Sequence, residues 1–85
     1  MDVDKSIIFR QIGAKVAYYR TLRNMTQADL ARKIHVSRST LGRIERGKYN
    51  QNVSISILLD IVAGLEIDIT MLLTFSEQEK IMWLV

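Results

Sequence analysis

The spacing of hydrophobic residues along the chain is helical almost from one end to the other. Between about Ser6 and Arg23, apolar residues recur every three or four positions and form a single stripe: Ile8, Ile12, Val16 and Tyr19. Shorter segments with the same period follow at about 27–34, 38–46, 55–65 and 69–73. Because the chain has only 85 residues, these five helices must pack into one compact all-α domain.

Residues that favour helix ends stand at the boundaries of these segments. Thr26 precedes the second helix and has Asp29 three positions later, a weaker form of the capping box than one with Glu. The other expected end residues are Ser37 or its neighbour, Ser54 and Asp68 as N-caps, and Gly47 as the left-handed stop of the third helix.

The last ten residues fit two structures. Ser76 to Glu79 fits a capping box ahead of a helix, whereas the continuous apolar run that follows could also be a strand. Exposed apolar residues would be a liability at the end of a monomer, so we expect a partner chain to cover Ile81, Met82, Trp83, Leu84 and Val85. The chain is thus divided into a domain of residues 1–75 and a C-terminal extension, residues 76–85, that makes a dimer contact.

Composition excludes several classes of protein. A hydrophobic content of 48% is sufficient for a core, and the absence of cysteine excludes disulfides and suits a reducing cytoplasm. No apolar run approaches the roughly 20 residues of a membrane span, and the first residues lack the order of a signal peptide. We therefore expect a cytoplasmic protein that does not associate with a membrane.

Charge is divided unequally along the chain. Residues 1–50 hold eleven Lys and Arg against four Asp and Glu, a net charge of +7. Residues 51–85 hold one Lys against five Asp and Glu, a net charge of −4. The basic half indicates a polyanionic partner, and the acidic, apolar half is expected to form the dimer surface.

The sequence offers no constellation for catalysis. His35 is the only histidine, and a lone His can neither supply a metal site nor serve the scattered serines as a complete triad. Gly42 and Gly47 do not form a phosphate-binding loop of the Walker type. We expect no enzyme activity, no metal and no cofactor.

The segment from Thr26 to Arg46 has the arrangement of a helix-turn-helix. Two short helices joined by a tight break pack at a steep angle and leave one face of the second helix free. That face is expected to carry groups that bind base edges and phosphates: Arg38, Ser39, Thr40, Gly42 and Arg43. Backbone N–H groups at the start of the helix also favour phosphate.

The same segment resembles a known family. The stretch from Thr26 to Lys48, TQADLARKIHVSRSTLGRIERGK, is similar to the phage Cro and repressor-like helix-turn-helix proteins, also called the xenobiotic-response-element family. The similarity extends upstream to Ile12-Gly13 and downstream to Leu65–Leu73, which is like the last helix of the family. The resemblance implies a five-helix repressor-like DNA-binding domain.

The resemblance also implies a role for each matched residue. Gln27 would grip a phosphate and brace the recognition helix, and Arg20 and Glu45 would form a partly buried ion pair that ties the first helix to the third. The implied DNA contacts are Arg38, Ser39 and Arg43 to bases, Ser37 and Thr40 to the backbone, and Lys48, Tyr49 and Asn50 to phosphates. The chain departs from the family at His35, where Gly is usual in a left-handed turn, and at Val53, where Pro is common.

These observations predict a sequence-specific transcriptional regulator. The preferred form is a homodimeric repressor that reads a pseudo-palindromic operator in the major groove of double-stranded DNA. Two alternatives remain open, namely an antitoxin that also represses its own promoter and a controller protein of a restriction–modification system. Under these alternatives a toxin or RNA polymerase would be a further protein partner.

Overall fold

Five helices make up the fold in the computed structural model, which describes residues 5–48, 54–76 and 78–79. They are α1 (Lys5–Leu22), α2 (Gln27–Ile34), α3 (Arg38–Glu45), α4 (Ile55–Leu65) and α5 (Thr70–Leu73). These ranges contain no strand, so the all-α prediction is confirmed, and residues 78 and 79 of the C-terminal extension are helical. None of these helices is long and apolar enough to cross a bilayer. The predictions for Tyr49, Asn50, Val53 and Ile81–Val85 concern residues outside the described ranges.

The N-caps expected at Thr26, Ser37 and Ser54 are confirmed, whereas Ile69 and not Asp68 is the N-cap residue of α5. The hydroxyl of Thr26 accepts from the N–H of Asp29 at 3.0 Å, and the carboxylate of Asp29 accepts from the N–H of Thr26 at 2.9 Å. These hydrogen bonds from Thr26 lower the pKa of Asp29 below its ordinary value. The hydroxyls of Ser37 and Ser54 each accept from the backbone N–H three residues later. Local side-chain chemistry therefore sets the start of α2, α3 and α4.

Four helix boundaries differ by one residue from the expected positions, and one of them is the end of α3, which lies at Glu45 instead of Arg46. Helix α1 runs from Lys5 to Leu22, one residue earlier at each end. Helix α5 begins at Thr70, and the Asp68 carboxylate accepts from the N–H of Thr70 at 3.1 Å. Asp68 thus satisfies a free N–H at the helix start, as expected, from one position further outside the helix.

Helices α1 to α4 all end with a residue in the left-handed conformation. These residues are Asn24 (φ 58°), His35 (φ 61°), Gly47 (φ 69°) and Glu66 (φ 58°). The N–H of each of these residues donates to the carbonyl three positions before it. The N–H of the residue that follows donates to the carbonyl five positions before that residue. The conformation expected of His35 and Gly47 is confirmed, whereas that of Asn24 and Glu66 was not predicted. A residue other than Gly costs about 1–2 kcal/mol in this conformation.

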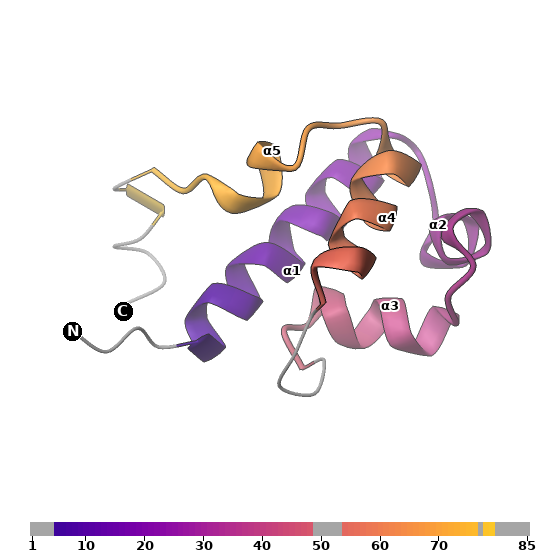
Figure 1. The fold of residues 1–85 in the computed structure, drawn as a ribbon, viewed down its shortest axis with the longest axis horizontal. Helices are drawn as coiled ribbons and strands as arrows, with labels where there is room; N and C mark the ends of the chain where they lie inside the picture. The colour runs from indigo at the N-terminus through magenta and orange to yellow at the C-terminus, as the bar shows by residue number, and fades with distance from the viewer. Residues whose placement is uncertain (1–4, 49–53, 77, 80–85) are drawn as a thin grey trace.

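One hydrophobic core joins the five helices. Figure 1 shows α1 running diagonally through the molecule, and α1 contacts α3, α4 and α5 while α2 contacts α3 and α4. Of the predicted stripe of α1, Ile12 and Val16 are buried, and Ile8 and Tyr19 pack against the core while partly exposed. The buried residues of the whole core are Ile12, Val16, Leu30, Ala31, Ile34, Leu41, Ile44, Leu58, Ile61, Val62, Leu65 and Leu72. Because the core takes up the inner faces of α2 and α3, the outer face of α3 remains free.

Helices α1 and α3 lie in close contact at Gly13. A Cβ atom on Gly13 would collide with the carbonyl oxygens of Ile44 and Glu45, the latter at 2.7 Å. These are backbone atoms and cannot move aside as a flexible side chain would. Only glycine fits here, and it allows α3 to lie directly against α1.

We predict that His35→Gly stabilises the protein. Glycine adopts the left-handed conformation without the steric penalty of a Cβ atom, which stabilises the folded protein. Glycine also raises the conformational entropy of the unfolded chain, which cancels part of this stabilisation. The free energy of unfolding in urea should rise by about 0.5–1 kcal/mol. Lys33→Gly, two positions earlier within α2, is the matched control and should lower it by about 1 kcal/mol. Equal losses for the two variants would contradict the prediction.

Candidate nucleic-acid interface

Helices α2 and α3 form the helix-turn-helix unit. The turn between them consists of His35, Val36 and Ser37, with His35 left-handed and Ser37 capping α3. Val36 is partly buried and packs against the core. Since the turn is this short and is held at both ends, it fixes the direction in which α3 is presented.

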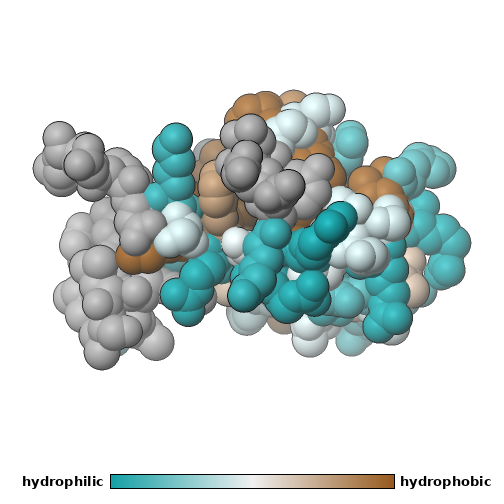
Figure 2. Space-filling view, turned by 90° about the horizontal axis from the view of Figure 1, so that it is seen from below, coloured by the Kyte–Doolittle hydropathy of each residue, from teal (hydrophilic) through white to brown (hydrophobic). Residues whose placement is uncertain are grey.

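The outward face of α3 is polar and cationic. Arg38, Ser39 and Arg43 are exposed, and Lys48 is exposed just beyond the helix. Figure 2 views the molecule from below Figure 1, the side on which α3 lies, and hydrophilic side chains cover the centre and right of this face. In the described part of the chain, none of these three basic side chains forms an ion pair. Their charges are therefore available to an external anion.

Ser37 and Thr40 occupy the start of α3. The Ser37 hydroxyl donates to the Thr40 hydroxyl at 2.8 Å and accepts from the N–H of Thr40 at 2.9 Å. Both residues are thus engaged in capping the helix. They lie where the resemblance implies backbone contacts, at the end of α3 at which free N–H groups favour phosphate.

A charged network behind this face joins three helices. Arg20 of α1 and Glu45 of α3 form a two-pronged ion pair, with Nε–Oε2 and Nη2–Oε1 distances of 2.7 and 3.0 Å. The Glu45 side chain is 5% exposed, and its hydrogen bond raises the pKa of Arg20 above the ordinary value. Gln27, the first residue of α2, donates its amide to Glu45 Oε1 at 3.0 Å. Glu45 thus holds α1, α2 and α3 at one point.

A groove lies on α3 beside this network. It has a volume of about 460 Å³ and is lined by Gln27, Arg38, Ser39, Gly42 and Arg46, which we call the α3 groove. Gly42, expected to face outward, is buried because the side chains of Arg46 and Gln27 cover it. Arg46 was not among the predicted site residues, although it stands eight positions after Arg38 and so extends the same face of the helix.

Comparison with known proteins agrees with this geometry. The family model described as Helix-turn-helix (HTH_3) matches residues 16–72, which include all of α2, α3 and α4. The chain belongs to the HTH_3 helix-turn-helix family. This is the Cro/C1-type family of DNA-binding transcriptional regulators that the sequence resembled.

Three relatives illustrate the match. An uncharacterised HTH-type transcriptional regulator from Methanocaldococcus jannaschii is 43% identical over 54 residues, which are 64% of this chain and 82% of the relative. The immunity repressor protein of Bacillus phage phi105 is 42% identical over 53 residues, which are 62% of this chain but only 35% of the repressor. The crystal structure of the restriction-modification controller protein C.AhdI from Aeromonas hydrophila has a TM-score of 0.70 and 30% identity, and covers 75% of this chain and 94% of that one.

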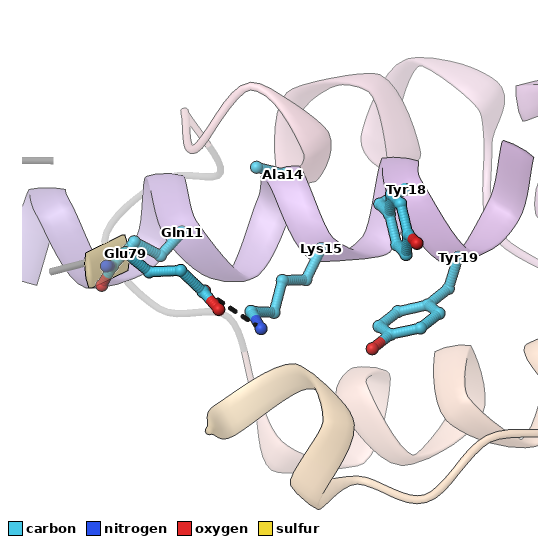
Figure 3. Close-up of a pocket in the computed structure, with 6 residues that line it drawn as sticks. All are labelled: Gln11, Ala14, Lys15, Tyr18, Tyr19 and Glu79. Carbon is cyan, nitrogen blue, oxygen red and sulfur yellow. Dashed lines mark ion pairs between the residues drawn. The ribbon is translucent and has the colours of Figure 1, made fainter. Parts of the chain in front are cut away.

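The HTH_3 domain has a second hollow, of about 370 Å³, between α1 and the C-terminal extension. Figure 3 shows the residues that line it: Gln11, Ala14, Lys15, Tyr18, Tyr19 and Glu79. Lys15 lies 3.1 Å from Glu79 and above the ring of Phe75, and its hydrogen bond lowers the pKa of Glu79. The ion pair between Lys15 and Glu79 therefore links the C-terminal extension to α1. Nowhere in the described ranges do three His, Cys, Asp or Glu residues gather that could hold a metal ion.

We predict that Glu45→Ala lowers the free energy of unfolding by about 3 kcal/mol, because it leaves the half-buried guanidinium of Arg20 without its partner. The matched control is Arg32→Ala, which removes the exposed ion pair with Asp29 and should cost less than about 0.5 kcal/mol. Urea unfolding of both variants, of Arg20→Ala and of the Arg20→Ala/Glu45→Ala double variant would measure the coupling between Arg20 and Glu45. A cost for Glu45→Ala as small as that of the control would overturn the assignment.

Proposed function

We propose that the protein is a homodimeric repressor that binds a pseudo-palindromic operator through α3 in the major groove. The observation that carries this proposal is the row of exposed side chains Arg38, Ser39 and Arg43 on α3. Arginine can donate two parallel hydrogen bonds to guanine, and serine can bind several base edges. The network of Arg20, Glu45 and Gln27 supports the role, since a rigid helix presents these groups in a fixed register.

The distribution of charge supports a DNA partner. The basic half of the chain contains α1, α2 and α3, with a net charge of +7 over residues 1–50. Lysine and arginine that neutralise phosphates release counterions from DNA, so binding should weaken steeply as salt is added. Lys48, with Tyr49 and Asn50 after it, would contact phosphates beside the recognition helix.

A row of exposed apolar residues on α4 supports the dimer. Ile55 is 64% exposed and Leu59 is 49% exposed, and the exposed Ala63 continues the row at the same spacing of four. The acidic half of the chain holds this row, together with the apolar residues Ile81–Val85. A second copy covering these residues would remove apolar surface from water. A pseudo-palindromic operator requires the two α3 helices of such a dimer to lie about 34 Å apart, one turn of DNA.

A controller protein of a restriction–modification system is a second candidate. The similarity to such a protein from Aeromonas hydrophila, of which this chain covers 94%, favours it. A reporter gene placed behind the operator distinguishes the two functions. A repressor only lowers its expression, whereas a controller that activates raises it.

We predict that Arg38→Ala and Arg43→Ala each weaken operator binding by about 1–3 kcal/mol and relax the base preference at one position. Lys48→Ala should instead weaken binding to all sequences alike, because a phosphate contact carries no sequence information. Selection of bound duplexes from a random library, with wild type and each variant, measures both effects. If both arginine variants select the wild-type operator unchanged, α3 does not read bases through these residues.

We predict that Leu59→Glu converts the dimer into a monomer in equilibrium sedimentation, because the new carboxylate would be buried in the interface. The matched control is Leu22→Glu on α1, which adds the same charge at a residue that is 63% exposed and should remain dimeric. A chain ending at Glu79 tests the contribution of Ile81–Val85 separately. A wild-type monomer at tens of micromolar would rule out the two-half-site arrangement.

A further inference from the structure

The α3 groove contains a gap in the row of side chains on the recognition helix. Arg38, Gly42 and Arg46 stand four residues apart and therefore lie along one face of α3. The middle member, Gly42, has no side chain and costs the helix stability compared with alanine. The two arginines thus stand at either end of a gap in the helix surface.

The side chains of Arg46 and Gln27 fill the space above Gly42. A Cβ atom on Gly42 would lie 3.2 Å from Nη1 of Arg46, and 3.7 and 3.9 Å from the amide oxygen and nitrogen of Gln27. The first distance is tighter than ordinary van der Waals contact, so the guanidinium occupies this position because Gly42 has no side chain. Arg46 therefore extends back along α3 toward the start of α2.

Two guanidinium groups, those of Arg38 and Arg46, line the α3 groove without an acidic partner in the described ranges. Arg46 forms no ion pair within the described ranges, and the only carboxylate of α3, Glu45, already binds Arg20 and Gln27. The amide nitrogen of Gln27 carries two hydrogens, of which Glu45 takes one. The guanidinium of Arg46, beside the Gln27 amide in a groove that Arg38 also lines, fits a ligand with several acceptor oxygens and negative charge, which on DNA is a backbone phosphate.

We propose that Arg46, held above Gly42 beside Gln27, binds the DNA phosphate that the resemblance assigns to Gln27, and that Gly42 is required to leave room for its guanidinium at this position. The inference rests on the proposed DNA-binding function and adds Arg46 to its contacts. Its specific consequence is that a methyl group on Gly42 weakens DNA binding although it touches only the end of a flexible side chain.

The test compares four proteins: wild type, Arg46→Ala, Gly42→Ala and the double variant. Each is titrated with a selected operator duplex and a random duplex at several salt concentrations. Arg46→Ala should weaken binding to both duplexes alike, about 10-fold at low salt, and reduce the slope of log affinity against log salt by about 0.9. Lys33→Ala is the matched control, because its ammonium lies 3.8 Å from Glu66 at the end of α4 and its loss should leave the slope unchanged.

Gly42→Ala tests whether the position of the Arg46 guanidinium matters for DNA binding, because this substitution leaves the net charge unchanged. The variant should melt a few degrees higher, because alanine favours the helix, while its affinity for DNA falls several-fold. In the Arg46→Ala background the same substitution should cost no further affinity, since the group that it displaces is absent.

Three results would overturn the inference. An unchanged salt slope in Arg46→Ala excludes a phosphate contact, and a loss limited to the operator duplex makes Arg46 a base contact instead. Fully additive losses in the double variant show that Gly42 does not act through Arg46. In all three cases wild type still binds DNA, whereas failure of wild type to bind either duplex would refute the proposed function itself and this inference with it.

Discussion

The buried carboxylate of Glu45 is the interaction on which the arrangement of the first three helices depends. A buried charge is tolerated only when it is fully paired, and Glu45 reaches this state by binding Arg20 from α1 and Gln27 from α2 at once. The three helices must therefore keep one relative orientation for the charge to be satisfied. The contact at Gly13, where α3 touches the backbone of α1, allows the approach that the ion pair requires.

The same pairing determines the electrostatics of the outer face. Glu45 is the only acidic residue of α3, and its charge is neutralised inside the protein by Arg20. The basic residues of the outer face consequently have no carboxylate on their own helix to bind, and they form no ion pair elsewhere in the described ranges. One interaction thus orients the recognition helix and leaves its surface cationic, which suits a polyanionic ligand.

Local sequence predicted the helices because local physics forms them. The period of apolar residues identified the buried stripe of α1, and the caps at Thr26, Ser37 and Ser54 follow from hydrogen bonds within three residues. The left-handed Glu66 was missed because residues other than Gly, Asn, Asp and His rarely adopt this conformation. Here Arg23 of the segment after α1 donates hydrogen bonds to the carbonyls of Leu65 and Glu66 and holds the end of α4. The pairing of Arg20 with Glu45, 25 residues apart, came from the resemblance and not from any local pattern.

The glycines show most clearly where sequence reasoning reaches its limit. At Gly13 a side chain would strike backbone atoms, and at Gly64 it would strike Ile34 and Leu30, which belong to the core. Packing between helices therefore accounts for both residues. At Gly42 a side chain would meet only the mobile ends of polar side chains, so the fold would tolerate alanine and gain helix stability from it. Core packing does not explain this glycine, and the space that it leaves on the outer face of α3 is the place where the guanidinium of Arg46 lies.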